Sequence, residues 1–204
     1  MKLIPIIAAA VSLCAAAPAF SAVTLDFEGT TSFSSIDNFY NGGTDGAGVS
    51  GVNYGVAFSG SALALDGSDS TLATPFTAPS GTHVFFAPDA PAVLNVASGF
   101  TTGLVFAYSS IVGTTEVKVF DGLNATGATL ATFMLGANSS AFELFSSVSK
   151  GFAGTAYSVS FGDNLGNIAY DNVTIGAVPE PGSVLLMALG LALVGVVARR
   201  QRQD

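Results

Sequence analysis

The chain has 204 residues, half of them hydrophobic and only a tenth charged, with a formal net charge of −8. Setting aside an apolar stretch at each end leaves about 155 residues, enough for one domain with a buried core. This central segment keeps two lysines against twelve acids, a net charge of −10. Such an acidic domain disfavours nucleic acids and anionic membranes as partners. The single cysteine, Cys14, lies in the first apolar stretch, so the central segment contains no disulfide or thiol chemistry.

The N-terminus has the three parts of a secretory signal peptide. Lys2 supplies a positive start, residues 3–17 are apolar and uncharged, and 18–22 form a small-residue exit. We predict a signal peptide over 1–21, because cleavage after Ser21 puts small residues at both recognised positions. Cleavage after Ala22 would put bulky Phe20 at one of them and stays an alternative. A lipoprotein signal is excluded because Leu13, and not a small residue, precedes Cys14.

The segment 22–176 is predicted to be all-β. Its first residues, Val23 to Glu28, alternate apolar and polar side chains, as a half-buried strand does. Pairs such as Asp66-Gly67 and Asp121-Gly122 mark the turns between strands. About ten short strands at this spacing predict an antiparallel β-sandwich of the jelly-roll type. The further predicted strands are 54–58, 83–87, 93–96, 104–108, 116–120, 129–135, 142–145, 156–161 and 168–175.

Catalytic motifs are not apparent. His83 is the one histidine, and it stands in a strand-like run beside Val84. The sequence has no cysteine–histidine pair, no pair of histidines for a metal and no Gly-x-Ser-x-Gly elbow. Carboxylate pairs are present, so a secreted hydrolase acting on polysaccharide stays an alternative. We predict that the protein is not an enzyme.

Two acidic motifs, at the first and last predicted strands, suggest a metal site. The first strand ends in Asp26-Phe27-Glu28, and the last contains Asp171. The pair resembles jelly-roll carbohydrate-binding modules, in which such acids hold a structural calcium. The resemblance implies Glu28 and Asp171 as calcium ligands, with Asp26 a weaker candidate, because calcium takes six to eight oxygen ligands. The alternative is that Asp26 and Glu28 are solvated strand residues.

The C-terminus reads as a membrane anchor. Residues 183–198 form an uncharged apolar run, which as a helix at ~1.5 Å per residue would span about 24 Å, slightly less than a bilayer core of ~30 Å. Arg199, Arg200 and Arg202 follow it. The positive-inside rule puts these arginines in the cytoplasm and the preceding domain outside, the orientation that a signal peptide also requires.

The tripeptide Pro179-Glu180-Pro181 stands just before this run. Two prolines keep the backbone extended and outside the helix. The order of tripeptide, apolar helix and arginine cluster over 177–204 resembles the PEP-CTERM sorting signal of Gram-negative bacteria. The resemblance implies an exosortase, a membrane protease or transpeptidase, as a partner. It also implies an exported protein, transiently anchored in the membrane and then at the cell surface or outside the cell.

Three functions are compatible with these features. The first is a non-enzymatic component of the extracellular matrix or biofilm that binds exopolysaccharide. The second is the secreted hydrolase, and the third is a purely structural matrix component. The absence of tryptophan, with five tyrosines in the chain, weakens a platform for stacking sugars.

Overall fold

The computed structural model describes residues 22–72, 75–162 and 166–176, and in these ranges every regular element is a strand. The predicted helices at 1–21 and 183–198 lie outside the described residues. The strands are β1 (Val23–Leu25), β2 (Val56–Gly60), β3 (Leu63–Asp66), β4 (His83–Phe86), β5 (Ala92–Phe100), β6 (Gly103–Ser110), β7 (Thr115–Phe120), β8 (Thr129–Leu135), β9 (Ser146–Gly151), β10 (Ala156–Phe161) and β11 (Ile168–Ile175).

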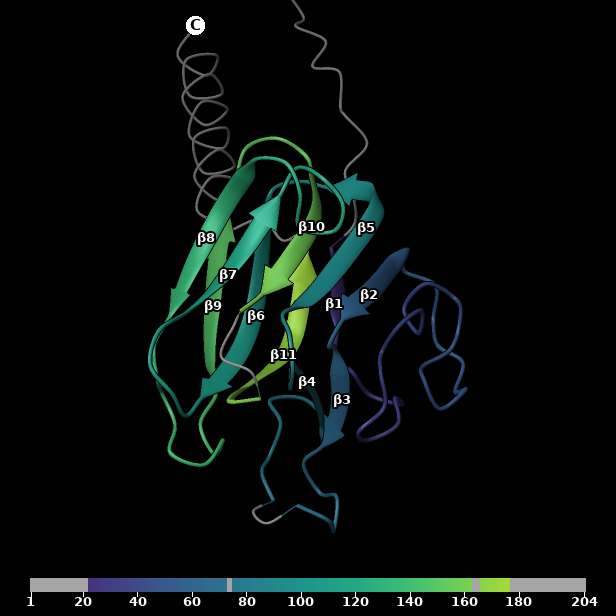
Figure 1. Ribbon diagram of the computed structural model, residues 1–204, viewed down its shortest axis with the longest axis vertical. Coiled ribbons are helices and arrows are strands. Elements are labelled where there is room, and N and C mark those ends of the chain that lie inside the picture. The colour runs from purple at the N-terminus through teal and green to yellow at the C-terminus, as the bar shows by residue number, and fades with distance from the viewer. Residues whose placement is uncertain (1–21, 73–74, 163–165, 177–204) are drawn as a thin grey trace, which may run out of the picture.

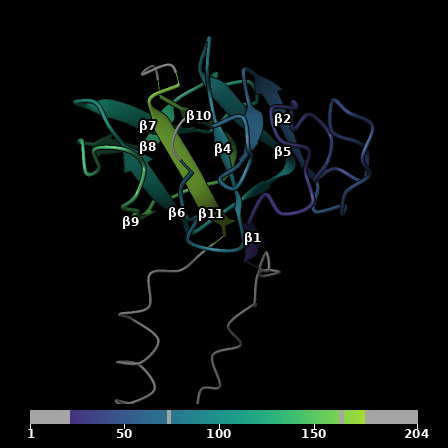
Figure 2. The same ribbon diagram turned by 90° about the horizontal axis from the view of Figure 1, so that it is seen from below.

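Two antiparallel sheets pack face to face (Figures 1 and 2). One sheet has the order β3-β4-β11-β6-β9, with β1 paired to the end of β11 beyond β4, and the other has the order β2-β5-β10-β7-β8. Every pairing between the strands of these sheets is antiparallel. The prediction of an all-β antiparallel sandwich is therefore confirmed.

The eight strands from β4 through β11 pair in a nested order, from the innermost pair outward. Strand β7 pairs with β8, β6 with β9, β5 with β10 and β4 with β11. The eight strands thus behave as one long hairpin rolled over two sheets, which is the connectivity of a jelly roll. Strand β1 pairs separately with β11, so the first and last strands of the described domain are neighbours.

Alternation of side chains builds the core between the sheets. On β7, Val117 and Val119 are fully buried, while Glu116 and Lys118 face outward. At the centre lies Phe85, whose ring centroid is 4.9–5.6 Å from those of Phe27, Phe58, Phe161 and Tyr170. Because Phe58 and Phe161 belong to the opposite sheet, this cluster joins the two layers.

The largest differences between predicted and observed strands occur at three places. Strand β1 ends at Leu25, since Phe27 has φ +61°, which breaks the extended chain. The predicted strand 142–145 is wrong: Phe142 has φ +63°, and the Glu143 carboxylate binds the hydroxyls of the serines before it. Strand β9 follows instead, at Ser146–Gly151, and β3 was not predicted.

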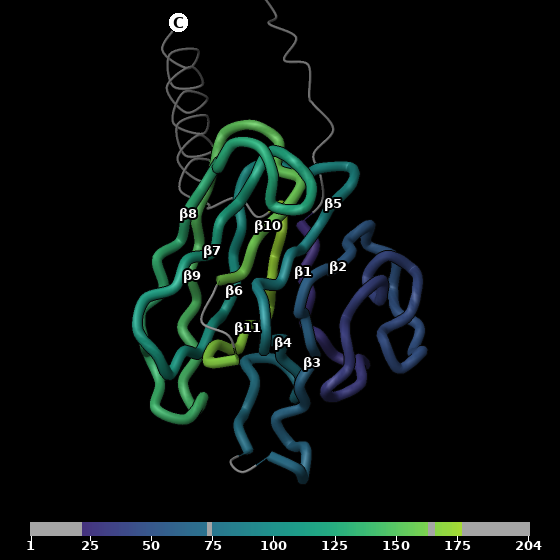
Figure 3. Tube along the Cα trace, in the orientation of Figure 1, coloured from purple at the N-terminus to yellow at the C-terminus, as the bar shows by residue number. Residues whose placement is uncertain are grey.

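The long connection between β1 and β2 packs beside the sandwich, at the purple and blue side of Figure 3. Its backbone closes one open side: Ala64 of β3 exchanges hydrogen bonds with this segment, and Phe58 of β2 donates to Asp37. Asp45 holds the connection together by accepting the N–H groups of Thr31, Ala47 and Val49. At the other open side, Lys150 of β9 donates through Nζ to the Thr132 carbonyl of β8 at 2.6 Å.

The two ends of the domain meet at one end of the sandwich. Val23 pairs with Ile175, and the Gly176 N–H donates to the Gly103 carbonyl at 3.1 Å. We call this end, uppermost in Figure 1, the Gly176 end. It is formed by the connections 101–102, 121–128 and 152–155, whereas 87–91, 111–114 and 136–145 lie at the opposite end.

Candidate functional site

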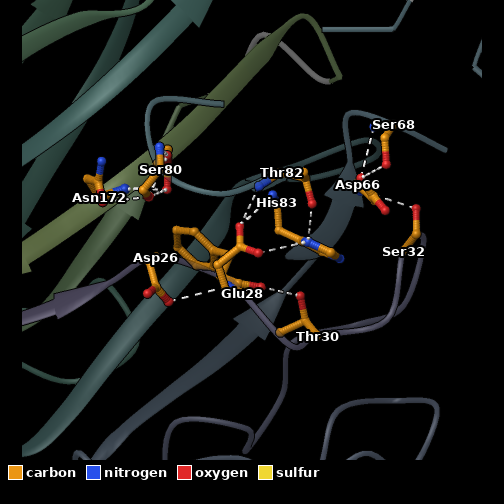
Figure 4. A network of polar contacts seen from close by, with 12 residues as sticks. Asp26, Glu28, Thr30, Ser32, Asp66, Ser68, Ser80, Thr82, His83 and Asn172 are labelled. Atoms are coloured by element: carbon orange, nitrogen blue, oxygen red, sulfur yellow. Dashed lines mark hydrogen bonds and ion pairs between the residues drawn. The ribbon is translucent and has the colours of Figure 1, made fainter. Parts of the chain in front are cut away.

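Glu28 lies just beyond β1, in the turn that Phe27 begins. The Phe27 N–H donates to the hydroxyl of Tyr40 at 2.7 Å, which fixes this turn, and burial raises the pKa of Tyr40, so the phenol stays neutral. The Glu28 carboxylate then reaches the residues that open β4 (Figure 4). Its Oε1 accepts the N–H groups of Thr82 and His83 at 2.8 and 2.7 Å, and its Oε2 lies 3.4 Å from His83 Nδ1.

Gly81 allows this close approach. It has φ +55°, and a Cβ built on it would lie 2.2–2.6 Å from the carboxylate atoms of Glu28. A larger residue there would be strained and would displace the carboxylate. The glycine is therefore part of the site, although the sequence prediction did not include it.

Asp171 is fully buried on β11 and faces the same segment. Its Oδ2 accepts the Ser80 N–H at 3.0 Å, and its Oδ1 accepts the Asn172 N–H at 2.6 Å. Burial raises the pKa of Asp171 to about 6, and the nearby negative charge of Glu28 adds to the rise. Asn172 has φ +51°, at an irregularity in the β11–β6 pairing that turns its side chain toward Ser80 (Figure 4).

The structure brings two of the three predicted ligands together. Glu28 and Asp171 bind consecutive parts of the segment 80–83, the first from the turn after β1 and the second from β11. Asp26 does not join them: it is exposed, and its Oδ1 lies 3.3 Å from the N–H of Glu28. In the described ranges, no three histidine, cysteine or acidic side chains are grouped to hold a metal.

The oxygens around Ser80 outnumber the protons available to them. The Ser80 hydroxyl oxygen lies 2.9 Å from Asn172 Oδ1 and 3.1 and 3.4 Å from the two Asp171 oxygens. One hydroxyl proton serves one of these three acceptors. A proton on Asp171, a cation, or an Asn172 amide rotated to present its Nδ2 to the Ser80 hydroxyl would relieve the excess. The neighbouring peptide N–H groups already bind the carboxylates of Glu28 and Asp171, and calcium at this site stays a prediction.

A second candidate site is a groove on the outer face of the other sheet. It has a volume of about 270 Å³. Asn95 of β5 donates to Ser59 Oγ at 3.2 Å and accepts the backbone N–H of Asn124 at 2.7 Å, which holds the 121–128 connection over the sheet. No charged side chain lines it, and its residues are Asn41, Gly55, Ala57, Asn95, Ala97, Leu123 and Asn124. The sequence analysis missed this groove because its asparagines come from three separate segments.

Comparison with known protein families identifies the C-terminal segment. The family model described as the PEP-CTERM protein-sorting motif matches residues 177–203. The chain carries a PEP-CTERM sorting signal. This finding confirms the resemblance seen in the sequence and indicates an exported protein with a C-terminal membrane-anchoring signal. A search of curated protein sequences finds no significant match.

Solved structures similar to this chain include carbohydrate-binding modules. A family 29 module from Piromyces equi has 11% identity and a TM-score of 0.43, covering 82% of this chain and 99% of its own. A family 6 module from Cellvibrio mixtus lichenase 5A, in complex with cellotriose, has 13% identity and a TM-score of 0.39, covering 50% and 83%. Since both TM-scores are low, the architecture rests on the sheet pairings described above.

The sorting signal begins directly after the last described residue of the domain. The backbone of Gly176 is bonded to β6, and the family match begins at residue 177. Pro179, Glu180 and Pro181 and the three arginines lie outside the described residues. Among the residues that the structure does describe, no helix is long and apolar enough to span a membrane.

Proposed function

We propose that this PEP-CTERM protein is exported, anchored by its C-terminal helix, processed by an exosortase at Pro179-Glu180-Pro181, and delivered to the extracellular matrix as a non-enzymatic component. The match to the sorting motif at 177–203 carries the proposal. Arg199, Arg200 and Arg202 hold the cytoplasmic side of the anchor, because basic residues flanking a span stay inside.

Processing tests this function. In a host with a working exosortase, the surface or medium fraction should contain a protein that lacks both residues 1–21 and the apolar tail, as measured by intact-mass spectrometry. Replacing Pro179, Glu180 and Pro181 together by alanine should leave the tail attached. Recovery of the tail-bearing chain from the unaltered protein in that host would refute the sorting function.

The groove is the surface we assign to glycan binding within that matrix. Asn41, Asn95 and Asn124 line it together with Ala97 and Leu123, so amide groups stand beside apolar surface. Amides offer both donors and acceptors to sugar hydroxyls, and the apolar residues offer contact to ring carbons. The net charge of −10 on the domain repels acidic polymers. The matching ligand is therefore a neutral polysaccharide.

Affinity electrophoresis of the segment 22–176 in gels containing neutral polysaccharides tests the groove. We expect retardation by at least one of them, and we expect Asn41→Ala to weaken it. The matched control is Ser70→Ala, an equally exposed polar residue in the β3–β4 connection, outside the groove. Migration unaffected by every neutral polysaccharide would refute glycan binding and leave the sorting function standing.

We also propose a structural calcium at the oxygen cluster of Asp171, Ser80 and Asn172. Support comes from the acceptor oxygens of Asp171 and Asn172 around the single Ser80 hydroxyl proton. Above its pKa of about 6, Asp171 also adds a negative charge to this cluster. A hard cation that accepts carboxylate, hydroxyl and amide oxygens would balance it. In this proposal Glu28 acts indirectly, by holding Thr82 and His83 in place.

A further inference from the structure

We propose that the Gly176 end of the domain faces the lipid headgroups while the sorting signal is still attached. The inference rests on the proposed function, since it requires the C-terminal anchor, and it identifies the surface that the domain turns toward the membrane. Three observations carry it: the length of the connection to the anchor, the pairing of the two domain ends, and the distribution of charge.

The connection to the anchor is short. The last described residue of the domain is Gly176, whose N–H is bonded to the Gly103 carbonyl, and the predicted helix begins at Ser183. Seven residue steps span at most about 24 Å, about the length of an eight-residue strand such as β11. The attachment point therefore stays within about 24 Å of the start of the predicted helix.

The N-terminal side of the domain leaves from the same end. Val23 and Ile175 are paired across β1 and β11. While the predicted signal peptide is attached, a second apolar segment thus begins within two residues of the Gly176 end. Two attachments at one end orient the domain more strongly than one.

Charge favours the same orientation after the signal peptide has been removed. The connections 101–102, 121–128 and 152–155 consist mainly of Thr, Gly and Ala, and they contain one acid, Asp121. This carboxylate accepts the Ala128 N–H at 2.6 Å, and Lys150 stands at the end of β9 next to the same connections. At the opposite end, Asp89 and Glu143 are acidic, with no lysine or arginine in the connections 87–91, 111–114 and 136–145. Anionic headgroups repel such an acidic surface more than the nearly neutral Gly176 end.

Two matched variants test the orientation in the full chain. Ala153 and Ala90 are both exposed alanines, in the 152–155 connection at the Gly176 end and in the 87–91 connection at the opposite end. Each is replaced by cysteine in a Cys14→Ser background and labelled with a fluorophore. The precursor is isolated from a host without exosortase and reconstituted into phosphatidylethanolamine–phosphatidylglycerol vesicles that carry a nitroxide on the headgroup. We expect the label at Ala153→Cys to be quenched and the label at Ala90→Cys to keep its emission.

A longer connection provides the control. Inserting about 20 Gly and Ser residues between Gly176 and Ala177 lets the domain rotate relative to the anchor. We then expect the labels at Ala153→Cys and Ala90→Cys to be quenched to the same extent. Equal quenching at both positions with the natural connection, or a difference that survives the insertion, would overturn the proposal. A chain that fails to sediment with the vesicles would instead refute the anchor, and the orientation would fall with it.

Discussion

Replacing Phe85 by alanine is expected to lower the free energy of unfolding of the segment 22–176 by about 3–5 kcal/mol. Phe85 has no exposed surface, and four other aromatic rings surround it. Its removal leaves a cavity between the two sheets, because Phe58 and Phe161 on one side and Tyr170 on the other belong to separate layers. A loss of this size is a large part of the ~5–15 kcal/mol that stabilises most domains.

Urea denaturation followed by intrinsic tyrosine fluorescence measures the effect. The control is Met134→Ala on β8, where the side chain is 62% exposed and points away from the core. A change within about 0.5 kcal/mol is expected for this surface position. If Phe85→Ala were as mild as Met134→Ala, the aromatic cluster would not be the junction of the two sheets.

The second large effect is expected at Asp171, and it depends on pH. Burial raises the pKa of this carboxyl from 3.8 to about 6 in the folded protein, so the folded state binds the proton more tightly than the unfolded state. Without metal, this group therefore destabilises the fold progressively as the pH rises from about 4 to 6. The full difference, about 3 kcal/mol for two pKa units, is present above pH 6.

The Asp171→Asn variant lacks this titrating carboxyl. Its comparison with the unaltered domain therefore separates the contribution of Asp171 from that of the other acids. In chelator, the free energy of unfolding of the variant minus that of the unaltered domain should rise by up to about 3 kcal/mol between pH 4 and pH 7.5. The lost acceptor for the Ser80 N–H costs about 1 kcal/mol at both pH values and cancels from the comparison. A difference that does not change with pH would show that Asp171 titrates normally.

Calcium should reverse this destabilisation in the unaltered domain. At pH 7.5 and a hundredfold excess over the dissociation constant, binding to the folded state contributes ~2.7 kcal/mol, which raises the melting temperature by about 5–10 °C for a domain of this size. Magnesium should do less, because it demands a tight octahedron. Asp171→Asn should lose the calcium increment, and a melting temperature indifferent to calcium and chelator would remove the site.

The alternation of side chains made most of the sandwich predictable. Strand β7 shows it clearly, and the prediction placed both β7 and β11 within a residue of their observed bounds. Strand β9 was not predictable this way, because its serines and Lys150 are exposed on both faces and only Val148 is partly buried. The apolar residues before it, Phe142 and Phe145, pack instead on the outer surface of the sheet, around Phe76.

Of the residues in the candidate site, only the acidic ones could be predicted from the sequence. The nearness of the first and last strands followed from the expected jelly roll, and Glu28 and Asp171 indeed approach one segment. That segment, 80–83, could not be inferred as a partner because residues 80–82 lie in the β3–β4 connection, whose path depends on Gly81. The groove was hidden for a related reason, since the left-handed conformation of Asn124 sets the 121–128 connection over β5.

The nested pairing of strands has a consequence for the order in which an exported chain can fold. If the protein crosses the membrane from its N-terminus, β1 emerges first, yet its partner β11 emerges last, about 150 residues later. The local hairpin of β7 and β8 can form early, whereas β5–β10 and β4–β11 close progressively longer loops and must wait. The final pairing becomes possible only when residue 175 is outside, with Pro179 four residues behind it. Completion of the domain and arrival of the sorting motif are thus nearly simultaneous. A chain that stalls before residue 175 has neither a closed fold nor an exposed motif for the proposed exosortase.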